Sequence, residues 1–423
     1  MEMLNLIIRA RIRNSGLFSF HWRCKELGIS MLSFADDLLL FSEADVNSVT
    51  LFKDALMEFS DASGLEANPS KSVILLSKSA ADMSTSIQTV LNFQIGLLHV
   101  KYLGVPINSS RITLADCAPL IAKMDKRLQG WSSYRLSFAA RVQLIRSILC
   151  SLSVYWSSSF ILPKGVIKVL EMKIRQFLWK GTNGTGYAKV SWHVCCLPKE
   201  SGEQGIPNLQ ALNQALISKH VWDFLQNKES SIWVQWVRTY KLRSKSTWEI
   251  PTASSTWSWK KILSLCRKLT PMLEFQIATG TKFWLWKDLW HPIGILSLLF
   301  PRAPTVTDKD VMTILGDIPS ISTGEDSILW KFGNFSTSSA YKVFSPTAAK
   351  VPWNGLSSAG LSSNGMEVLN GDGTVQRQAS HYGSLPSNLS LFGVSHLEGK
   401  KQPSILQHFF FSRGGFITCC GAS

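Results

Sequence analysis

The chain has 423 residues, of which 45% are hydrophobic and 17% are charged, and its formal net charge is +15. This composition excludes a disordered chain and leaves room for two or three domains with a sizeable core. No stretch approaches the roughly 18 uncharged apolar residues of a membrane-spanning helix, and the first basic residues follow an apolar run, the reverse of a signal peptide. We therefore expect neither a transmembrane segment nor a membrane partner.

The charge is unevenly distributed along the chain. Residues 1–100 contain 8 Lys/Arg and 11 Asp/Glu, a net charge of −3, whereas residues 101–250 contain 21 against 8, a net charge of +13. The remaining residues contribute +5, from 15 against 10. An acidic segment followed by a basic one suits a cation site beside a surface that follows a phosphate backbone, although a merely soluble basic protein would also have a positive total.

Eight cysteines are present, without a Cys-x-x-Cys pair and without the Cys/His spacing of a zinc finger. The sequence therefore does not support a zinc site. Reduced thiols in an intracellular compartment are expected, with the nucleus left open as the location.

The first hundred residues alternate short strand and helix signals. We expect a helix and loop over residues 1–28, two strands at Ile29–Phe34 and Leu38–Ser42, an amphipathic helix at Asp45–Ser63 that ends at Gly64, and a buried strand at Val73–Leu76. Lys101–Ile107 is expected to be a strand that a glycine interrupts and a proline closes.

Two adjacent carboxylates, Asp36 and Asp37, lie where one apolar run stops and the next begins. A strand cannot bury such a pair on both sides, so we expect a hairpin with both residues at its tip. Adjacent acidic groups repel each other and usually need a compensating cation, for which Mg²⁺ with its oxygen ligands is the usual choice. The alternative is a solvated hairpin tip, because aspartate favours turns.

From Thr113 the pattern becomes helical, with helices expected up to Gly130, from about Ser137, over Val166–Trp179 and through most of residues 208–248. Arg141 and Arg146 are expected to point outward and to be available for a ligand. A glycine-rich loop is expected at residues 181–186. Residues 346–423 are rich in Ser, Gly and Asn without clear periodicity, which predicts weak order.

Three motifs in order resemble one family. Ser33–Phe41 resembles the metal-binding hairpin of reverse transcriptases, in the Phe-Ala-Asp-Asp form of LINE-type (non-LTR) retrotransposons. Ser63–Ser72 matches that family's Ser-Gly-Leu-x-x-Asn-x-x-Lys-Ser/Thr element, and Lys101–Ile107 resembles its primer-grip hairpin. Gly130–Arg141, Gly205–Leu209, Gly280–Trp290 and Gly333–Tyr341 continue the resemblance to plant members, apart from Ala140, where the family commonly has glycine.

The resemblance implies an α+β fold: a partial right-hand polymerase palm with a short antiparallel sheet, a largely helical thumb and connector, and a weakly ordered tail. It implies RNA-templated DNA synthesis from deoxynucleoside triphosphates with Mg²⁺, and thus an RNA template and a DNA primer as partners. Asp36 is expected to coordinate the metal and Asp37 to support it. Lys71 inherits a role near the triphosphate, with a surface lysine in a turn as the alternative.

The nucleic-acid contacts that the resemblance implies come from the three motifs and the basic segment. Tyr102, Leu103 and Gly104 would lie against the primer, where glycine permits close approach of a backbone. The same residues also fit a core strand with a bulge. The tryptophans could stack on bases, but core packing is the favoured interpretation. The full set of expected contact residues is Phe34, Tyr102, Leu103, Gly104, Arg141 and Arg146.

Four segments are expected: the rear of the palm at 1–110, a basic helical thumb and connector at 111–250, a Trp-rich connector at 251–345 and the tail at 346–423. Intact members of the family place another catalytic aspartate on a strand upstream, and residues 1–35 contain none. The zinc ligands that follow in the family are not found after Tyr341. We therefore expect a remnant that does not catalyse alone; a noncatalytic nucleic-acid-binding protein and a pseudogene product without selected role remain as alternatives.

Overall fold

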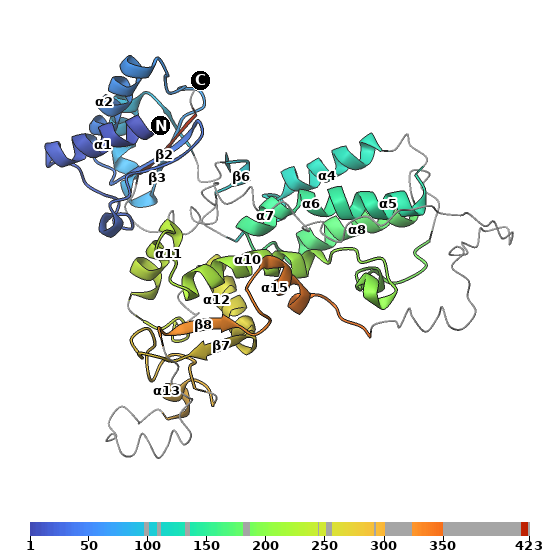
Figure 1. Ribbon diagram of the computed structural model, residues 1–423. Coiled ribbons are helices and arrows are strands. Elements are labelled where there is room, and N and C mark those ends of the chain that lie inside the picture. The colour runs from blue at the N-terminus through green and yellow to red at the C-terminus, as the bar shows by residue number, and fades with distance from the viewer. Residues whose placement is uncertain are drawn as a thin grey trace, which may run out of the picture.

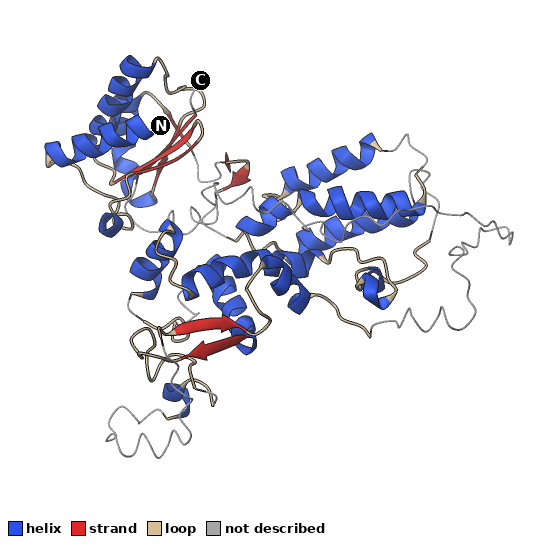
Figure 2. Ribbon diagram, viewed as in Figure 1, coloured by secondary structure: helices blue, strands red, loops and turns tan. Residues whose placement is uncertain are grey.

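The structure is a computed structural model that describes residues 1–96, 101–107, 111–131, 136–180, 187–243, 245–250, 256–291, 293–300, 324–349 and 416–421. The fold is α+β, as predicted. Figure 2 shows the strands gathered in an N-terminal lobe, in a short hairpin beside it and in a two-stranded ribbon at the far end of a helical body. The predicted loop at 181–186 lies outside the described residues.

The N-terminal lobe combines three helices with a five-stranded sheet of order β1-β2-β9-β3-β4. α1, α2 and α3 pack through a shared apolar cluster on one face of the sheet; α1, α2 and the sheet are seen at the upper left of Figure 1. The elements are α1 (Glu2–Ser15), β1 (Met31–Phe34), β2 (Asp37–Ser42), α2 (Val46–Ser63), β3 (Val73–Leu76), α3 (Ser84–Leu91), β4 (Gln94–Ile95) and β9 (Phe416–Gly421).

The strand β9 contradicts part of the predicted weakly ordered tail. Residues 416–421 pair antiparallel with both β2 and β3 and lie in the middle of the sheet. The prediction failed because the stabilising partners of this segment are more than 300 residues away, and local composition does not record them. Most of the remaining tail lies outside the described residues.

The helix α2 shows how local signals set the boundaries in this lobe. Asp45 caps its start, with the side chain accepting a hydrogen bond from Ser48 N at 2.8 Å. Gly64 ends it at φ 71°, a left-handed conformation that glycine adopts without steric cost. Val49 and Phe52 on the inner face are fully buried against the sheet. The predicted helix is confirmed.

A helical body follows the lobe. It contains α4 (Ala118–Gly130), α5 (Phe138–Leu144), a π-helical turn (Ile145–Leu149), α6 (Cys150–Leu152), α7 (Val154–Ser159), α8 (Lys164–Lys180), α9 (Trp192–Cys195), α10 (Leu209–Leu225) and α11 (Ile232–Trp236) with a second π-helical turn (Val237–Leu242). Figure 1 shows α10 running along the centre of this body. The predicted helices of residues 113–248 are confirmed.

Two buried polar side chains of α10 hold the end of α7. Asn213 Nδ2 donates to Ser157 O at 2.7 Å and to Phe160 O at 2.6 Å, and its Oδ1 accepts from Leu162 N at 2.8 Å. One ring nitrogen of His220, two turns further along, lies 2.8 Å from the carbonyl oxygen of Ser158. These bonds satisfy the carbonyls that α7 leaves open where it ends.

The last part of the body pairs β7 (Leu273–Gln276) with β8 (Ser327–Trp330) beside α12 (Trp257–Leu269), α13 (Leu296–Leu299) and α15 (Thr337–Phe344). Several tryptophans serve the core: Trp236 and Trp259 are at most 1% exposed, and Trp222 stacks on Phe335 with ring centroids 4.8 Å apart. This agrees with the predicted packing role. Trp284 is the exception among those described, with 50% of its surface exposed. One apolar cluster joins residues of the lobe, the body and the β7–β8 ribbon.

Asp326 ties the loop after β7 to β8. Its carboxylate accepts from the backbone N–H groups of Ala278, Gly280 and Lys282 at 2.7, 2.9 and 2.8 Å. Burial alone would raise its pKa, but these amide donors hold the pKa at about 2. A carboxyl whose pKa is lower in the folded than in the unfolded chain stabilises the fold above about pH 4, and the contribution is lost as the pH falls toward 2.

We expect Asp326→Asn to lower the free energy of unfolding by about 2 kcal/mol at neutral pH. The difference between wild type and variant should shrink as the pH falls from 4 to 2. Thermal unfolding of both proteins across this range checks the prediction, and Glu325→Gln, one residue earlier and 83% exposed in its side chain, is the control. A difference that does not depend on pH would contradict it.

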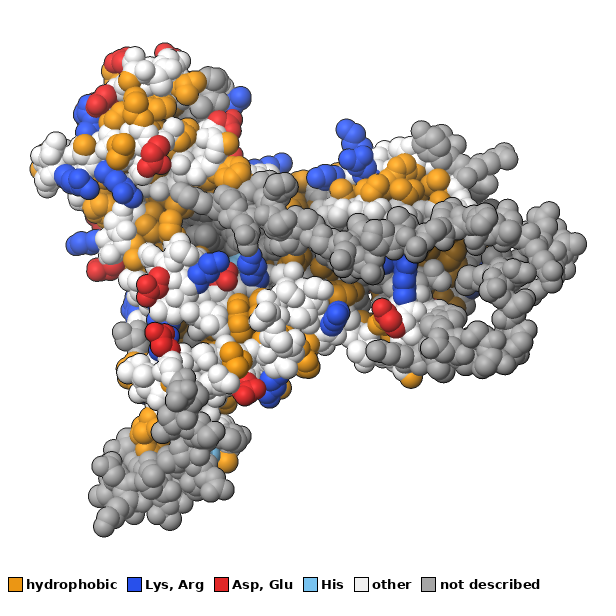
Figure 3. All heavy atoms as spheres, viewed as in Figure 1, with side chains coloured by type: hydrophobic (Ala, Val, Ile, Leu, Met, Phe, Trp, Pro, Cys, Tyr) orange, Lys and Arg blue, Asp and Glu red, His pale blue; other side chains and the backbone are white. Residues whose placement is uncertain are grey.

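In the described part of the chain, no helix is both long and apolar enough to cross a membrane. On the face shown in Figure 3, lysine and arginine side chains stand in small separate groups over the lobe and the body.

Candidate functional site

The predicted hairpin with the Asp pair at its tip is confirmed. β1 and β2 are antiparallel, and Phe34 opposite Asp37 is the last pair of their ladder. Ala35 and Asp36 form the two-residue turn between them. Ala35 has φ 50°, a left-handed conformation that costs a residue with a Cβ about 1 kcal/mol. The turn holds the two carboxylates on adjacent residues at the end of the sheet.

The two carboxylates have different surroundings. Asp36 is exposed, whereas Asp37 is half-buried and accepts a hydrogen bond from the backbone N–H of Leu103. Burial raises the pKa of Asp37, and the nearby charge of Asp36 raises it further, while the Leu103 amide opposes both effects. Asp37 is thus the oriented member of the pair, and a cation at the tip would relieve the repulsion that raises its pKa.

A second hairpin meets the first at this point. β5 (Lys101–Tyr102) and β6 (Val105–Pro106) are antiparallel and are joined by Leu103 and Gly104, both with positive φ, 51° and 78°. The segment is thus a hairpin rather than the single interrupted strand that was expected, because Leu103 and Gly104 reverse the chain between β5 and β6. Tyr102 is 4% exposed and belongs to the core cluster, whereas a Cβ added at Gly104 would meet only open space. The tip of this hairpin is accessible and its base is packed.

Tyr155, at the start of α7, was not among the predicted residues. Its hydroxyl donates to Leu103 O at 2.7 Å, so Leu103 contacts Asp37 through its N–H and Tyr155 through its carbonyl. Burial raises the pKa of Tyr155 to about 12, with a further contribution from the charge of Asp37. The surrounding sequence is rich in serine, and nothing local marks this tyrosine.

Lys71 lies at the same end of the sheet as the Asp pair. Asn68 organises the turn before it: its side chain accepts from Ser70 N at 3.0 Å, and its carbonyl accepts from Lys71 N at 3.1 Å. Val73 pairs with Cys419, so extending this antiparallel register by two residues sets Lys71 level with Gly421, the partner of Asp37.

The two predicted arginines are not part of this cluster. Arg141 is half-buried and its Nη1 donates to Phe177 O at 3.4 Å, which makes it a contact between α5 and α8 rather than an outward group. Burial lowers its pKa. Arg146 lies in the π-helical turn after α5. Neither arginine forms a hydrogen bond or ion pair with the β1–β2 hairpin in the described structure. The expected outward orientation of Arg141 was wrong, because a helix packs on that side.

The donor set at the tip suits one hard cation in part. Asp36 and Asp37 supply carboxylate oxygens, and Mg²⁺ often binds through one or two carboxylates together with substrate phosphates. Among the described residues, no three His, Cys, Asp or Glu side chains gather as a metal-binding group. The strand beside β2 has Gly421 at the register position of Asp37 and contains no acidic residue.

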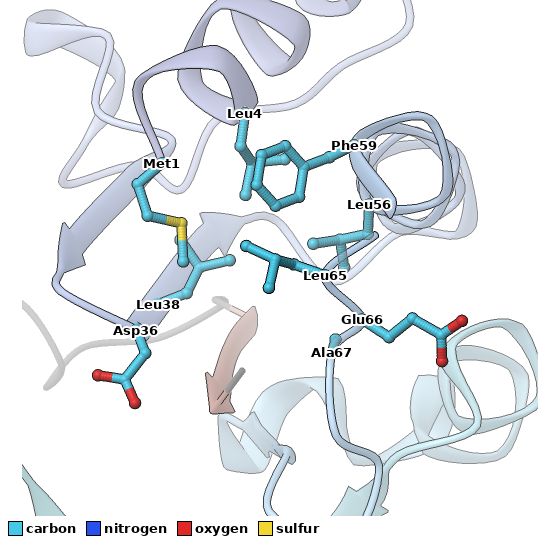
Figure 4. Close-up of a pocket in the computed structure, with 9 residues that line it drawn as sticks. All are labelled: Met1, Leu4, Asp36, Leu38, Leu56, Phe59, Leu65, Glu66 and Ala67. Atoms are coloured by element: carbon cyan, nitrogen blue, oxygen red, sulfur yellow. The ribbon is translucent and has the colours of Figure 1, made fainter. Parts of the chain in front are cut away.

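Beneath the hairpin lies a shallow pocket with apolar walls. Figure 4 shows Leu38, Phe59 and Leu65 converging on its centre, while Asp36 and Glu66 lie at its rim with their carboxylates directed away from it. The apolar side chains that line the pocket pack the hairpin against α1 and α2, and the two carboxylates at its rim do not point into it.

No family model matches the chain. In an alignment 290 positions long that covers 59% of the chain, the chain is 27% identical to a protein of Arabidopsis thaliana with the provisional name ribonuclease H protein. The matched region covers 45% of that protein, so the chain spans less than half the length of this relative.

Proposed function

We propose that the chain derives from the reverse transcriptase of a LINE-type retrotransposon, that it binds RNA and DNA, and that as a single chain it does not extend a primer. The observation that carries this proposal is the meeting of three separate motifs at one end of one sheet. The amide of Leu103 bonds to Asp37, 66 positions earlier in the chain, and Lys71 lies at the same end two strands away. A solvated hairpin tip does not require these neighbours.

In this proposal each motif keeps one task. Asp36 and Asp37 would hold a Mg²⁺ ion, which would supply charge neutralisation for nucleotidyl transfer. Lys71 faces the triphosphate of a deoxynucleotide, and the open tip at Gly104 lies along the DNA primer on its RNA template. Tyr155 positions that tip through its hydrogen bond to the carbonyl oxygen of Leu103.

The proposed lack of synthesis by the chain alone follows from the donor set. Two-metal nucleotidyl transfer needs carboxylates from more than one strand to hold two ions about 4 Å apart. The described neighbours of Asp37 across the sheet are Phe34 and Gly421, and neither supplies an oxygen from its side chain.

The name of the Arabidopsis relative raises a second activity, cleavage of RNA in an RNA–DNA hybrid. That chemistry also depends on grouped carboxylates, and the described residues contain no group of three. We therefore assign this chain nucleic-acid binding rather than cleavage. Incubation of a labelled RNA–DNA hybrid with the chain and Mg²⁺ tests this assignment, and we expect the RNA strand to remain intact.

We expect a primer–template duplex to bind the chain with strong salt dependence. If about four phosphates are neutralised, the affinity should fall about a hundredfold between 50 and 200 mM salt. Fluorescence anisotropy of a labelled RNA–DNA duplex measures this fall. Lys71→Gln combined with Lys101→Gln, next to the proposed site, should reduce the slope of log affinity against log salt by about two.

The matched control is Arg267→Gln with Lys268→Gln, two exposed basic residues at the end of α12, far from the hairpin. This control should leave the slope unchanged. Absence of binding at 50 mM salt, or an equal effect of both double variants, would contradict the proposed surface.

A further inference from the structure

The strand β2 has the character of a central strand. Five of its six residues are buried. Leu38 and Leu40 face the cluster under α1 and α2, and Leu39 and Phe41 face the cluster shared with the helical body. With both faces covered, water cannot reach the backbone of this strand from above or below. Its second edge, away from β1, therefore needs a hydrogen-bonding partner.

That partner is β9, from the far end of the chain. All six residues of β2 are in register with Phe416–Gly421, and the four residues of β3 are in register with the other edge of the same segment. β2 and β3 do not pair with each other. Because one strand lies between them, β2 and β3 are two strand spacings, about 10 Å, apart. The backbone groups of one therefore cannot form hydrogen bonds with those of the other. Figure 1 shows the red C-terminal strand beside β2.

The composition of residues 416–421 suits this position. The segment Phe-Ile-Thr-Cys-Cys-Gly contains no charge and no proline, and it begins with aromatic and β-branched residues, which favour strands. It runs antiparallel to both neighbours. Its hydrogen-bonding partners, β2 and β3, belong to the N-terminal lobe. The other described elements of this lobe all lie within the first 96 residues.

We propose that the space between β2 and β3 is a strand-binding slot and that residues 416–421 are its intramolecular ligand. The N-terminal lobe then completes its sheet by β-augmentation from its own chain, more than 300 residues away. A slot of this kind can also take the same strand from a second copy, which is strand exchange. We commit to the strand of the same chain, because residues 416–421 of that chain fill the slot in the structure. This inference does not depend on the proposed function.

The first test is a disulfide in the full-length chain. Cys419 is the register partner of Val73, and directly paired antiparallel residues have Cα atoms about 4.5–5.5 Å apart, within disulfide range. Under mild oxidation, Val73→Cys should form an intramolecular disulfide with Cys419, seen by peptide mass spectrometry. The product should disappear in Val73→Cys with Cys419→Ser. Ser77→Cys, beyond the end of β3, should not form it.

The second test breaks the strand without shortening the chain. Thr418 pairs with Leu40 on one side and Ile74 on the other, and proline there removes a backbone donor from the middle of a sheet. Thr418→Pro should accelerate hydrogen exchange of the amides of residues 38–41 at least tenfold. A synthetic peptide of residues 413–423 added in excess should restore protection, and a scrambled peptide should not.

Three results would overturn the proposal. A disulfide found between two copies would mean that the slot takes the strand of another chain. Absence of any Val73→Cys product with Cys419 would mean that the segment does not lie in the slot. Unchanged exchange in Thr418→Pro would mean that β2 does not depend on this strand.

Discussion

Replacing Asn213 with leucine is expected to lower the free energy of unfolding by about 4 kcal/mol. Asn213 is 2% exposed and makes three hydrogen bonds to the segment that ends α7. Leucine has a similar shape but no polar group, so the carbonyls of Ser157 and Phe160 and the N–H of Leu162 would be left buried without this partner. Urea unfolding followed by circular dichroism measures the loss.

The control is Gln214→Leu at the next position of α10, which is only partly buried and should change the stability by no more than about 0.5 kcal/mol. If Asn213→Leu lowered the free energy of unfolding by less than about 1 kcal/mol, the proposed clamp, which is the set of three Asn213 hydrogen bonds between α10 and the end of α7, would be contradicted. Because Tyr155 in α7 supports Leu103, a true loss of this clamp should also weaken the contact with Asp37.

Local signals were enough to predict the elements that form the site. The break between two apolar runs at Asp36 and Asp37 predicted the hairpin, and the amphipathic spacing that ends at Gly64 predicted the extent of α2. Each of these signals acts within a few residues of the structure it sets, which is why sequence reasoning could use it.

The features that could not be predicted depend on contacts between distant segments. Tyr155 meets Leu103 across 52 residues, and Arg141 turns to Phe177 across 36. β9 reaches β2 from the far end of the chain. In two of these cases the local sequence suggested something else, an outward arginine and an unordered tail, and in the case of Tyr155 it suggested no role at all. Only the packed arrangement selects between such alternatives.

The second large effect concerns catalysis. In the proposed function Asp36 and Asp37 would supply only part of a two-metal site, because the described strands on both sides of β2 lack a carboxylate at the level of Asp37. Nucleotidyl transfer depends almost wholly on metal-assisted positioning and charge neutralisation. Loss of half the ligands is therefore expected to remove synthesis altogether rather than to slow it slightly.

Primer extension by the purified full-length chain tests the central claim most directly. The assay uses the RNA–DNA primer–template that the chain binds, deoxynucleoside triphosphates, and Mg²⁺ or Mn²⁺. Asp36→Ala is the test variant, and Glu66→Ala, which removes the other carboxylate at the rim of the same pocket, is its control. We predict binding without nucleotide incorporation above background. Template-dependent incorporation that Asp36→Ala abolishes and Glu66→Ala preserves would contradict the account.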